Sequence, residues 1–216
     1  MSKTKYNKGG IIYKILNFRI SVLLSNLIFQ GIRYMSLGEK IYKISLTLIF
    51  GSIFYLLIRN IFISILFGHI LNYILNGQFY VVFRYLSSKR TMSSDDLTNY
   101  VVLINKLIKI FSPKDVLIIG SLARGRMSKT SDLDIRLYHD DAFLNSLKAY
   151  FMATLLRLFG LFMRFPIDIF CFSDLRFLDK ISKKEIPVNF LKNNNFLKKY
   201  PTSKNYNEHI KTLIIC

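Results

Sequence analysis

The stretch LIIGSLARGRMSKTSDLDIRLY, residues 117–138, decides the fold of this chain. It opens with an apolar run typical of a buried strand, and this run ends at Gly120-Ser121. Ten residues rich in cations follow, and a second apolar run then contains Asp132 and Asp134. Because residues two apart in a strand point to the same face, the pattern places both carboxylates together at the start of the second strand.

The flanking sequence predicts a small α/β domain around these two strands. Capping residues after Arg90 and apolar positions at helical spacing predict a helix that ends near residue 111. We expect strands at residues 116–119, 133–138 and 166–172, a short helix after Gly120-Ser121, and a long helix after Asp140. Asp168 lies inside the third strand and can supply a third carboxylate.

Two adjacent carboxylates repel each other, and a hard divalent cation such as Mg²⁺ relieves that repulsion while phosphate oxygens complete its coordination. Gly120-Ser121 ends a strand and opens a helix, where free backbone N–H groups favour a phosphate and glycine allows close approach. Cations between the Gly-Ser motif and the aspartates could bind a triphosphate on the side opposite the metal. These cations are Arg124, Arg126 and Lys129.

Gly120-Ser121, the Asp132-Leu133-Asp134 motif ten residues later and the strand aspartate Asp168 together resemble the signature of the DNA polymerase beta superfamily of nucleotidyltransferases. The likeness is greatest to the minimal nucleotidyltransferases and covers roughly residues 95–175. Gly-Ser and Asp-x-Asp are each common, whereas their spacing between two apolar strands is not. The resemblance therefore rests on the combination.

The resemblance implies a small mixed sheet flanked by helices, with Asp132 and Asp134 holding two Mg²⁺ ions, for which Mn²⁺ could substitute. It further implies that Asp168 shares the metal nearest the attacking hydroxyl, and that Gly120 and Ser121 bind the nucleoside triphosphate. The implied reaction is in-line attack of an acceptor hydroxyl on the α-phosphate with release of pyrophosphate.

Each motif also has a purely structural interpretation. Asp132 could be a turn residue, Asp134 could pair with Arg136, and Asp168 could pair with Arg164. The arginines could form a solvated basic face. These alternatives stay open at the level of sequence.

Charge and cysteine content narrow the compartment and the partners. The chain has 31 Lys and Arg against 13 Asp and Glu, a net charge of +18 that favours anionic partners. Nucleic acid is less favoured than membrane phospholipid, because the cations are dispersed and form no recognised nucleic-acid-binding motif. Two cysteines, Cys171 and Cys216, suggest a reducing compartment.

Two uncharged apolar runs, residues 44–58 and 61–83, are interrupted only by Arg59-Asn60 and predict a membrane-associated helical region. The alternative is a buried helical core of a soluble protein. Cations stand at both ends of the region, which predicts a hairpin or in-plane insertion with both flanks on the cytoplasmic side. These cations are Lys40 and Lys43 before it and Arg84, Lys89 and Arg90 after it.

One face of the second apolar run is polar, because His69, Asn72 and Asn76 recur at helical spacing. Polar groups at membrane depth usually face protein or water. They could bind a polar or lipid-linked substrate, or they could form hydrogen bonds between helices, which is the interpretation we favour.

We therefore expect a membrane-associated region in residues 1–90, a nucleotidyltransferase-like domain in 91–181, and a basic tail in 182–216. The predicted protein is a Mg²⁺-dependent nucleotidyltransferase of the membrane with its catalytic domain in the cytoplasm, where nucleoside triphosphates are. Its acceptor is open among lipid-linked, glycan-related and protein hydroxyls. Two alternatives are an antitoxin-like enzyme that transfers AMP to a partner protein and a noncatalytic membrane adaptor that keeps the fold.

Overall fold

The computed structural model describes residues 19–29, 32, 35–76, 94–127, 131–163, 167–174, 176, 186–191, 204–205 and 214–215. Its helices are α2 (Arg19–Phe29), α3 (Leu37–Ile58), α4 (Ile61–Leu75), α6 (Ser94–Phe111), α7 (Gly120–Ala123) and α8 (Phe143–Phe162). Its strands are β1 (Asp115–Ile119), β2 (Arg126–Met127), β3 (Leu133–Tyr138), β4 (Ile167–Phe172), β5 (Val188–Asn189), β6 (Lys204–Asn205) and β7 (Ile214–Ile215).

Five strands form a mixed sheet in the order β4-β3-β1-β5-β6, and β2 pairs with β7 in a separate two-stranded sheet. β1 runs antiparallel to both β3 and β5, whereas β3 and β4 are parallel, as are β5 and β6. Parallel neighbours need a long crossover, and α8 supplies it between β3 and β4. The expected small mixed sheet with flanking helices is confirmed.

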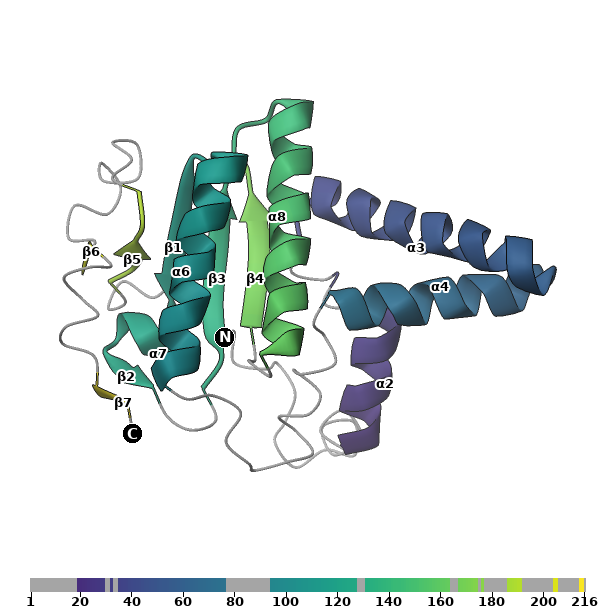
Figure 1. Ribbon diagram of the computed structural model, residues 1–216, viewed down its shortest axis with the longest axis horizontal. Helices are drawn as coiled ribbons and strands as arrows, with labels where there is room; N and C mark the ends of the chain where they lie inside the picture. The colour runs from purple at the N-terminus through teal and green to yellow at the C-terminus, as the bar shows by residue number, and fades with distance from the viewer. Residues whose placement is uncertain are drawn as a thin grey trace.

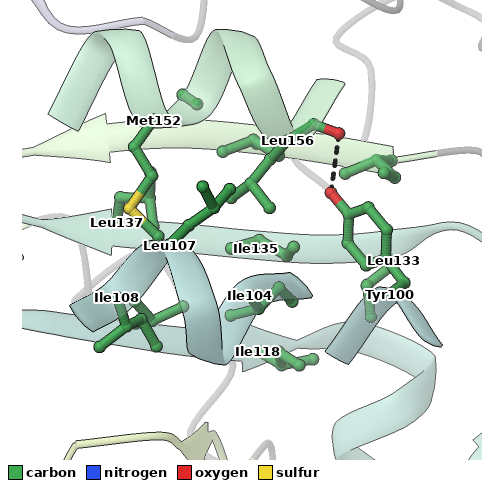
Figure 2. Close-up of a cluster of buried hydrophobic side chains, with 14 of the residues drawn as sticks. Tyr100, Ile104, Leu107, Ile108, Ile118, Leu133, Ile135, Leu137, Met152 and Leu156 are labelled. Carbon is green, nitrogen blue, oxygen red and sulfur yellow. Dashed lines mark hydrogen bonds between the residues drawn. The ribbon is translucent and has the colours of Figure 1, made fainter. Parts of the chain in front are cut away.

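The core lies between one face of this sheet and the helices α6 and α8, which lie along that face in Figure 1. Alternate residues of β3 point into it, so Leu133, Ile135 and Leu137 are fully buried. Figure 2 shows these leucines and isoleucines interleaved with side chains of both helices, and the buried Tyr100 hydroxyl donates to the Leu156 carbonyl at 2.9 Å. The opposite face of the sheet carries polar side chains beside apolar ones.

The predicted strands 116–119, 133–138 and 166–172 match β1, β3 and β4 to within a residue. The predicted helices match α6, α7 and α8. The strands β5, β6 and β7 could not be predicted, because strands of two residues have no periodicity. They come from residues 182–216, which we expected to be a basic tail.

Helices α3 and α4 form an antiparallel hairpin that projects away from the sheet (Figure 1). Two residues suffice for the turn, because Arg59 adopts the left-handed conformation (φ 57°) and ends α3 while Asn60 caps α4. The Asn60 side chain accepts a hydrogen bond from the Ile63 amide at 3.2 Å.

The two hairpin helices approach each other closely at Gly51 and Gly68. A β-carbon built on Gly68 would lie 2.5 Å from the Gly51 nitrogen and 2.7 Å from the Thr47 carbonyl oxygen. Glycine at 68 therefore allows backbone-to-backbone packing, as small residues do between membrane helices.

The two helices do not coincide with the two apolar runs. Helix α3 begins at Leu37, before the first run, and ends with it at Ile58. Helix α4 begins with the second run but ends at Leu75, with Asn76 as its C-cap. Residues 77–83 of the predicted run lie outside the described part. Of the described helices, α3 is the one long and apolar enough to cross a membrane.

Most apolar side chains of α3 are not covered by the rest of the chain. Its most apolar window of 18 residues has a mean hydropathy of 1.9 and is only 11% buried. Near the tip, Leu57 is 77% and Phe62 83% exposed. A buried core of this chain therefore does not account for the apolarity of the hairpin.

The base of the hairpin joins the α/β domain through a buried ion pair. Glu39 of α3 and Arg157 of α8 are almost fully buried, and Arg157 Nη2 lies 2.7 Å from Glu39 Oε1. Arg157 also donates to Asn76 Oδ1 at 3.2 Å and to the Ile169 carbonyl of β4. The Cys171 amide of β4 donates to Glu39 Oε2 at 3.1 Å. One network thus connects both ends of the hairpin to the sheet.

The polar face of α4 bonds to other helices. Asn72 donates to the Lys43 carbonyl and to Thr47 Oγ1 of α3, both at 2.8 Å, and His69 Nε2 lies 2.7 Å from the Leu27 carbonyl of α2. Hydrogen bonding between helices is the arrangement that the sequence analysis favoured for these residues.

We expect Gly68→Ala to destabilise the protein by about 1–3 kcal/mol, because the new methyl group would push the hairpin backbones apart. Gly51→Ala is the matched control, since its β-carbon would meet Ile65 Cα at an ordinary 3.4 Å. Thermal unfolding in detergent micelles measures both. Equal midpoints for the two variants would contradict the close packing at Gly68.

Asp115, at the start of β1, is fully buried, and burial raises its pKa from 3.8 to about 7. Between these values the folded protein keeps a proton that the unfolded chain has released, so the free energy of unfolding falls as pH rises from about 4 to about 7. We expect Asp115→Asn to remove this part of the pH dependence.

Denaturant unfolding at pH 5 and pH 8 measures the effect, and Asp141→Asn, at an exposed acid of the same domain, serves as the control. Asp115→Asn should gain stability relative to the wild type on going to pH 8. Parallel curves for the wild type and Asp115→Asn would show that burial does not shift this carboxyl.

Candidate active site

Asp134 and Asp168 face each other on the sheet surface opposite α6 and α8. The parallel register pairs Asp134 of β3 directly with Asp168 of β4. Their neighbours Leu133, Ile135 and Ile169 point into the core, so strand alternation turns both carboxylates to the other face. The sequence-predicted strand aspartates are therefore brought together.

Gly120 lies against the carboxylate of Asp134. It ends β1, opens α7 and has a φ of +77°, a conformation that glycine adopts without strain. A β-carbon at this position would lie 2.2 Å from Asp134 Oδ2. Any other residue would have to displace the carboxylate, which explains why the motif needs glycine.

Asp132 and Ser121 lie next to this pair. The Ser121 hydroxyl donates to the Asp132 carbonyl at 3.4 Å, which ties the first turn of α7 to the residue before β3. Asp132 is half-buried and close enough for its charge to act on Asp134. The Gly-Ser turn and the Asp-x-Asp motif thus form one locus.

Arg136 sits between the two facing carboxylates. Its Nη2 lies 3.6 Å from Asp134 Oδ1 and 3.4 Å from Asp168 Oδ2. Its other contacts fix it in place, because Nη1 donates to the carbonyls of Ile135 at 2.9 Å and Asp168 at 3.1 Å. Its guanidinium carbon lies 4.8 Å from the centre of the Phe170 ring.

The pairing of Asp134 with Arg136, which we considered as a structural alternative, is therefore observed, but Arg136 pairs with Asp168 as well. Arg164, the alternative partner that we considered for Asp168, lies outside the described residues. The sequence analysis did not foresee the second pairing, although Arg136 and Asp168 share one face of neighbouring strands.

The carboxyl group of Asp134 is strongly perturbed. The pKa of Asp134 is raised from 3.8 to about 7, mainly by burial; the guanidinium of Arg136 lowers it, and the charges of Asp168 and Asp132 raise it. Burial and like charges outweigh the guanidinium, so the Asp134 carboxylate takes up a proton or a cation readily.

The three cations predicted to contact phosphates lie in different parts of the chain. Arg124 is exposed and follows α7 directly. Arg126 lies in β2, which pairs with β7 through Arg126↔Ile214. Lys129 lies outside the described residues. Arg124 is thus the one whose exposed side chain the structure describes near the Gly-Ser turn.

The donor set suits a hard cation, since carboxylate oxygens are the ligands that Mg²⁺ prefers. Within the described ranges, however, no three acidic, histidine or cysteine side chains converge closely enough to hold a metal ion. Asp134 and Asp168 supply two ligands, and Arg136 holds them in the present arrangement. Phosphate oxygens of a nucleotide could complete such a site.

Two residues near the site were not predicted as part of it. Glu39 and Arg157 bond the backbone of β4 on either side of Phe170, close to Asp168. A signal was present for both, because Glu39 is the one acid before residue 90 and Arg157 interrupts an apolar helix. Neither position could be linked to β4 without the fold.

We expect Gly120→Ala to destabilise the protein by about 1–3 kcal/mol, because it combines backbone strain at positive φ with a clash against Asp134. Ser121→Ala removes only a long hydrogen bond next to it and should cost less. Denaturant unfolding of the two variants tests the difference. A Gly120→Ala protein as stable as the wild type would contradict the close approach.

Comparison with known proteins places this site within a family. A family model described as a nucleotidyltransferase domain matches residues 103–212, just over half of the chain, and covers both the Gly-Ser turn and the aspartates. No curated protein and no solved structure matches the chain significantly. The mixed sheet and the Gly120, Asp134 and Asp168 cluster are thus found where the matched domain lies, and the chain belongs to the nucleotidyltransferase domain family.

Proposed function

We propose that this protein transfers a nucleoside monophosphate from a nucleoside triphosphate to an acceptor hydroxyl at the membrane. The family implies the nucleotide substrate and the general reaction. The observation that carries the assignment to particular residues is the register of Asp134 with Asp168 beside Gly120.

In this proposal Asp132, Asp134 and Asp168 hold two Mg²⁺ ions, for which Mn²⁺ could substitute. The ions supply charge neutralisation at the phosphates and activation of the acceptor hydroxyl. Asp134 and Asp168 are held opposite each other by the strand register and by Arg136, so they are oriented before substrate binds. Gly120 leaves room for phosphate oxygens, and Ser121 and Arg124 donate hydrogen bonds to them.

The acceptor oxygen attacks the α-phosphorus, the bond from that phosphorus to the bridging oxygen breaks, and pyrophosphate leaves. A carboxylate of the site takes the hydroxyl proton. Arg136 remains beside the carboxylates and adds a fixed positive charge near the reacting phosphates. No covalent intermediate with the protein is needed.

We propose that the hairpin of α3 and α4 enters the bilayer from the cytoplasmic side. Both ends of the hairpin contact Arg157 through Glu39 and Asn76, so both lie on the side of the catalytic domain. The 15 residues of α4 are about 22 Å long at 1.5 Å per residue, less than the roughly 30 Å of a hydrocarbon core. A re-entrant hairpin fits these lengths better than two full crossings.

This placement favours acceptors that lie at the membrane surface, such as lipid-linked, glycan-related or protein hydroxyls. Nucleic acid is a less favoured acceptor. Nucleoside triphosphates are cytoplasmic, in keeping with a catalytic domain on that side.

A noncatalytic adaptor is the second candidate, and one observation favours it. Arg136 already offers one positive charge to both facing carboxylates, and the described residues contain no group of three metal ligands. In that case the fold would serve as a nucleotide sensor or docking surface without turnover.

We expect membranes containing the wild-type protein to incorporate label from one of the α-³²P nucleoside triphosphates in the presence of Mg²⁺. Asp132→Ala/Asp134→Ala should reduce incorporation by about two orders of magnitude or more, because it removes the ligands of the ions. Asp141→Ala, at an exposed acid of the same domain, should leave it unchanged. Migration of the label with lipid, glycan or protein identifies the acceptor class, and equal labelling by all three proteins would favour the adaptor.

We expect Leu57→Asp/Phe62→Asp to release the protein from liposomes, because each aspartate at membrane depth costs roughly 2.5–3.5 kcal/mol. Ile110→Asp changes an exposed apolar side chain of α6 and serves as the control. Flotation of the purified proteins with liposomes measures binding. Full flotation of the double variant would contradict insertion of the hairpin tip.

A further inference from the structure

Strand β4, which contains Asp168, forms one edge of the five-stranded sheet. On its inner side it pairs with β3, and its outer side has no neighbouring strand in the described sheet. The backbone groups of alternate residues point outward from such an edge and require partners when they are buried. For β4 these groups include the carbonyl of Ile169 and the amide of Cys171, which belong to buried residues.

Glu39 and Arg157 satisfy these two backbone groups. Arg157 donates to the Ile169 carbonyl, and Glu39 Oε2 accepts from the Cys171 amide at 3.1 Å. In a parallel ladder, one residue of a neighbouring strand would bond the same two groups: its amide would donate to the Ile169 carbonyl, and its carbonyl would accept from the Cys171 amide. The ion pair, closed at 2.7 Å, therefore takes the place of a missing strand.

The Glu39–Arg157 pair bonds β4 directly beside Asp168 of the candidate site. Asp168 directly precedes Ile169 in β4, and the Asp168 side chain faces Asp134 and Arg136. Movement of the free edge of β4 would therefore change the separation of the two facing carboxylates. The Glu39–Arg157 pair restrains that edge from the side opposite β3.

We propose that Glu39 and Arg157 are positioning residues for Asp168, so that the base of the hairpin is a structural part of the nucleotidyl-transfer site. The inference rests on the proposed function for the role of Asp168, whereas the edge contacts stand independently of it. Arg157 also donates to Asn76 Oδ1 at 3.2 Å, which brings the far end of the hairpin into the same support.

The test uses the full chain in detergent micelles and two readouts. Hydrogen exchange of the Cys171 amide reports the edge contact, and electron paramagnetic resonance of Mn²⁺ with a nonhydrolysable nucleoside triphosphate reports the site. Glu39→Leu/Arg157→Met replaces the pair by apolar side chains without leaving a buried charge unpaired. Asn60→Ala is the control, because it removes a hydrogen bond at the far tip of the hairpin and leaves the contacts of Glu39 and Arg157 in place.

We expect the double variant to exchange the Cys171 amide faster and to bind Mn²⁺ about 10- to 100-fold more weakly, as loss of a supporting contact typically does. Asn60→Ala should change neither readout. Wild-type exchange and wild-type Mn²⁺ affinity in the double variant would overturn the proposal. If the wild type itself binds no Mn²⁺, the proposed function fails, and the exchange rate alone then decides whether the pair supports the edge.

Glu39→Gln provides a second variant if the double substitution does not fold. It keeps the shape of the side chain but leaves one carbonyl oxygen for two donors, the Arg157 guanidinium and the Cys171 amide. We expect both readouts to shift in the same directions by smaller amounts. A folded Glu39→Gln protein with unchanged exchange and unchanged Mn²⁺ affinity would equally overturn the proposal.

Discussion

The buried ion pair between Glu39 and Arg157 is the contact on which the arrangement of the described chain depends. It joins the first turn of α3 to α8 and to the outer edge of β4. Removing one partner of such a pair typically costs about 3–5 kcal/mol, because the other charge stays buried without compensation. Here the charges also satisfy backbone groups, so the pair determines how the hairpin and the sheet sit together.

The candidate site depends on a second balance of charges, on the open face of the sheet. Strand alternation sends apolar side chains into the core and brings Asp134 and Asp168 together on the other side. Arg136 partly offsets their repulsion, yet burial and like charge still raise the pKa of Asp134 to about 7. This is the electrostatic condition in which a divalent cation, or a nucleotide with its cation, is most strongly favoured.

Much of the α/β domain could be predicted from sequence, because its signals are local. The periodicity of residues 116–119 and 133–138 gives the strands, and the alternation within Asp132-Leu133-Asp134 gives the shared face. The roles of Glu39 and Arg157 could not be predicted, since they are 118 positions apart and meet only through the tertiary fold. The end of α4 could not be read from hydropathy, because the apolar run continues past the cap at Asn76.

In this account the hairpin and the sheet form one structural unit around the proposed nucleotide site. The most direct test is calorimetric titration of a nonhydrolysable nucleoside triphosphate with Mg²⁺ into the full chain and into a chain of residues 91–216. We predict binding by the full chain and binding weaker by about tenfold or more by the shorter chain, once circular dichroism shows it to be folded, because its β4 edge and Arg157 lack Glu39. Equal affinities would contradict it and would make the hairpin a separable anchor.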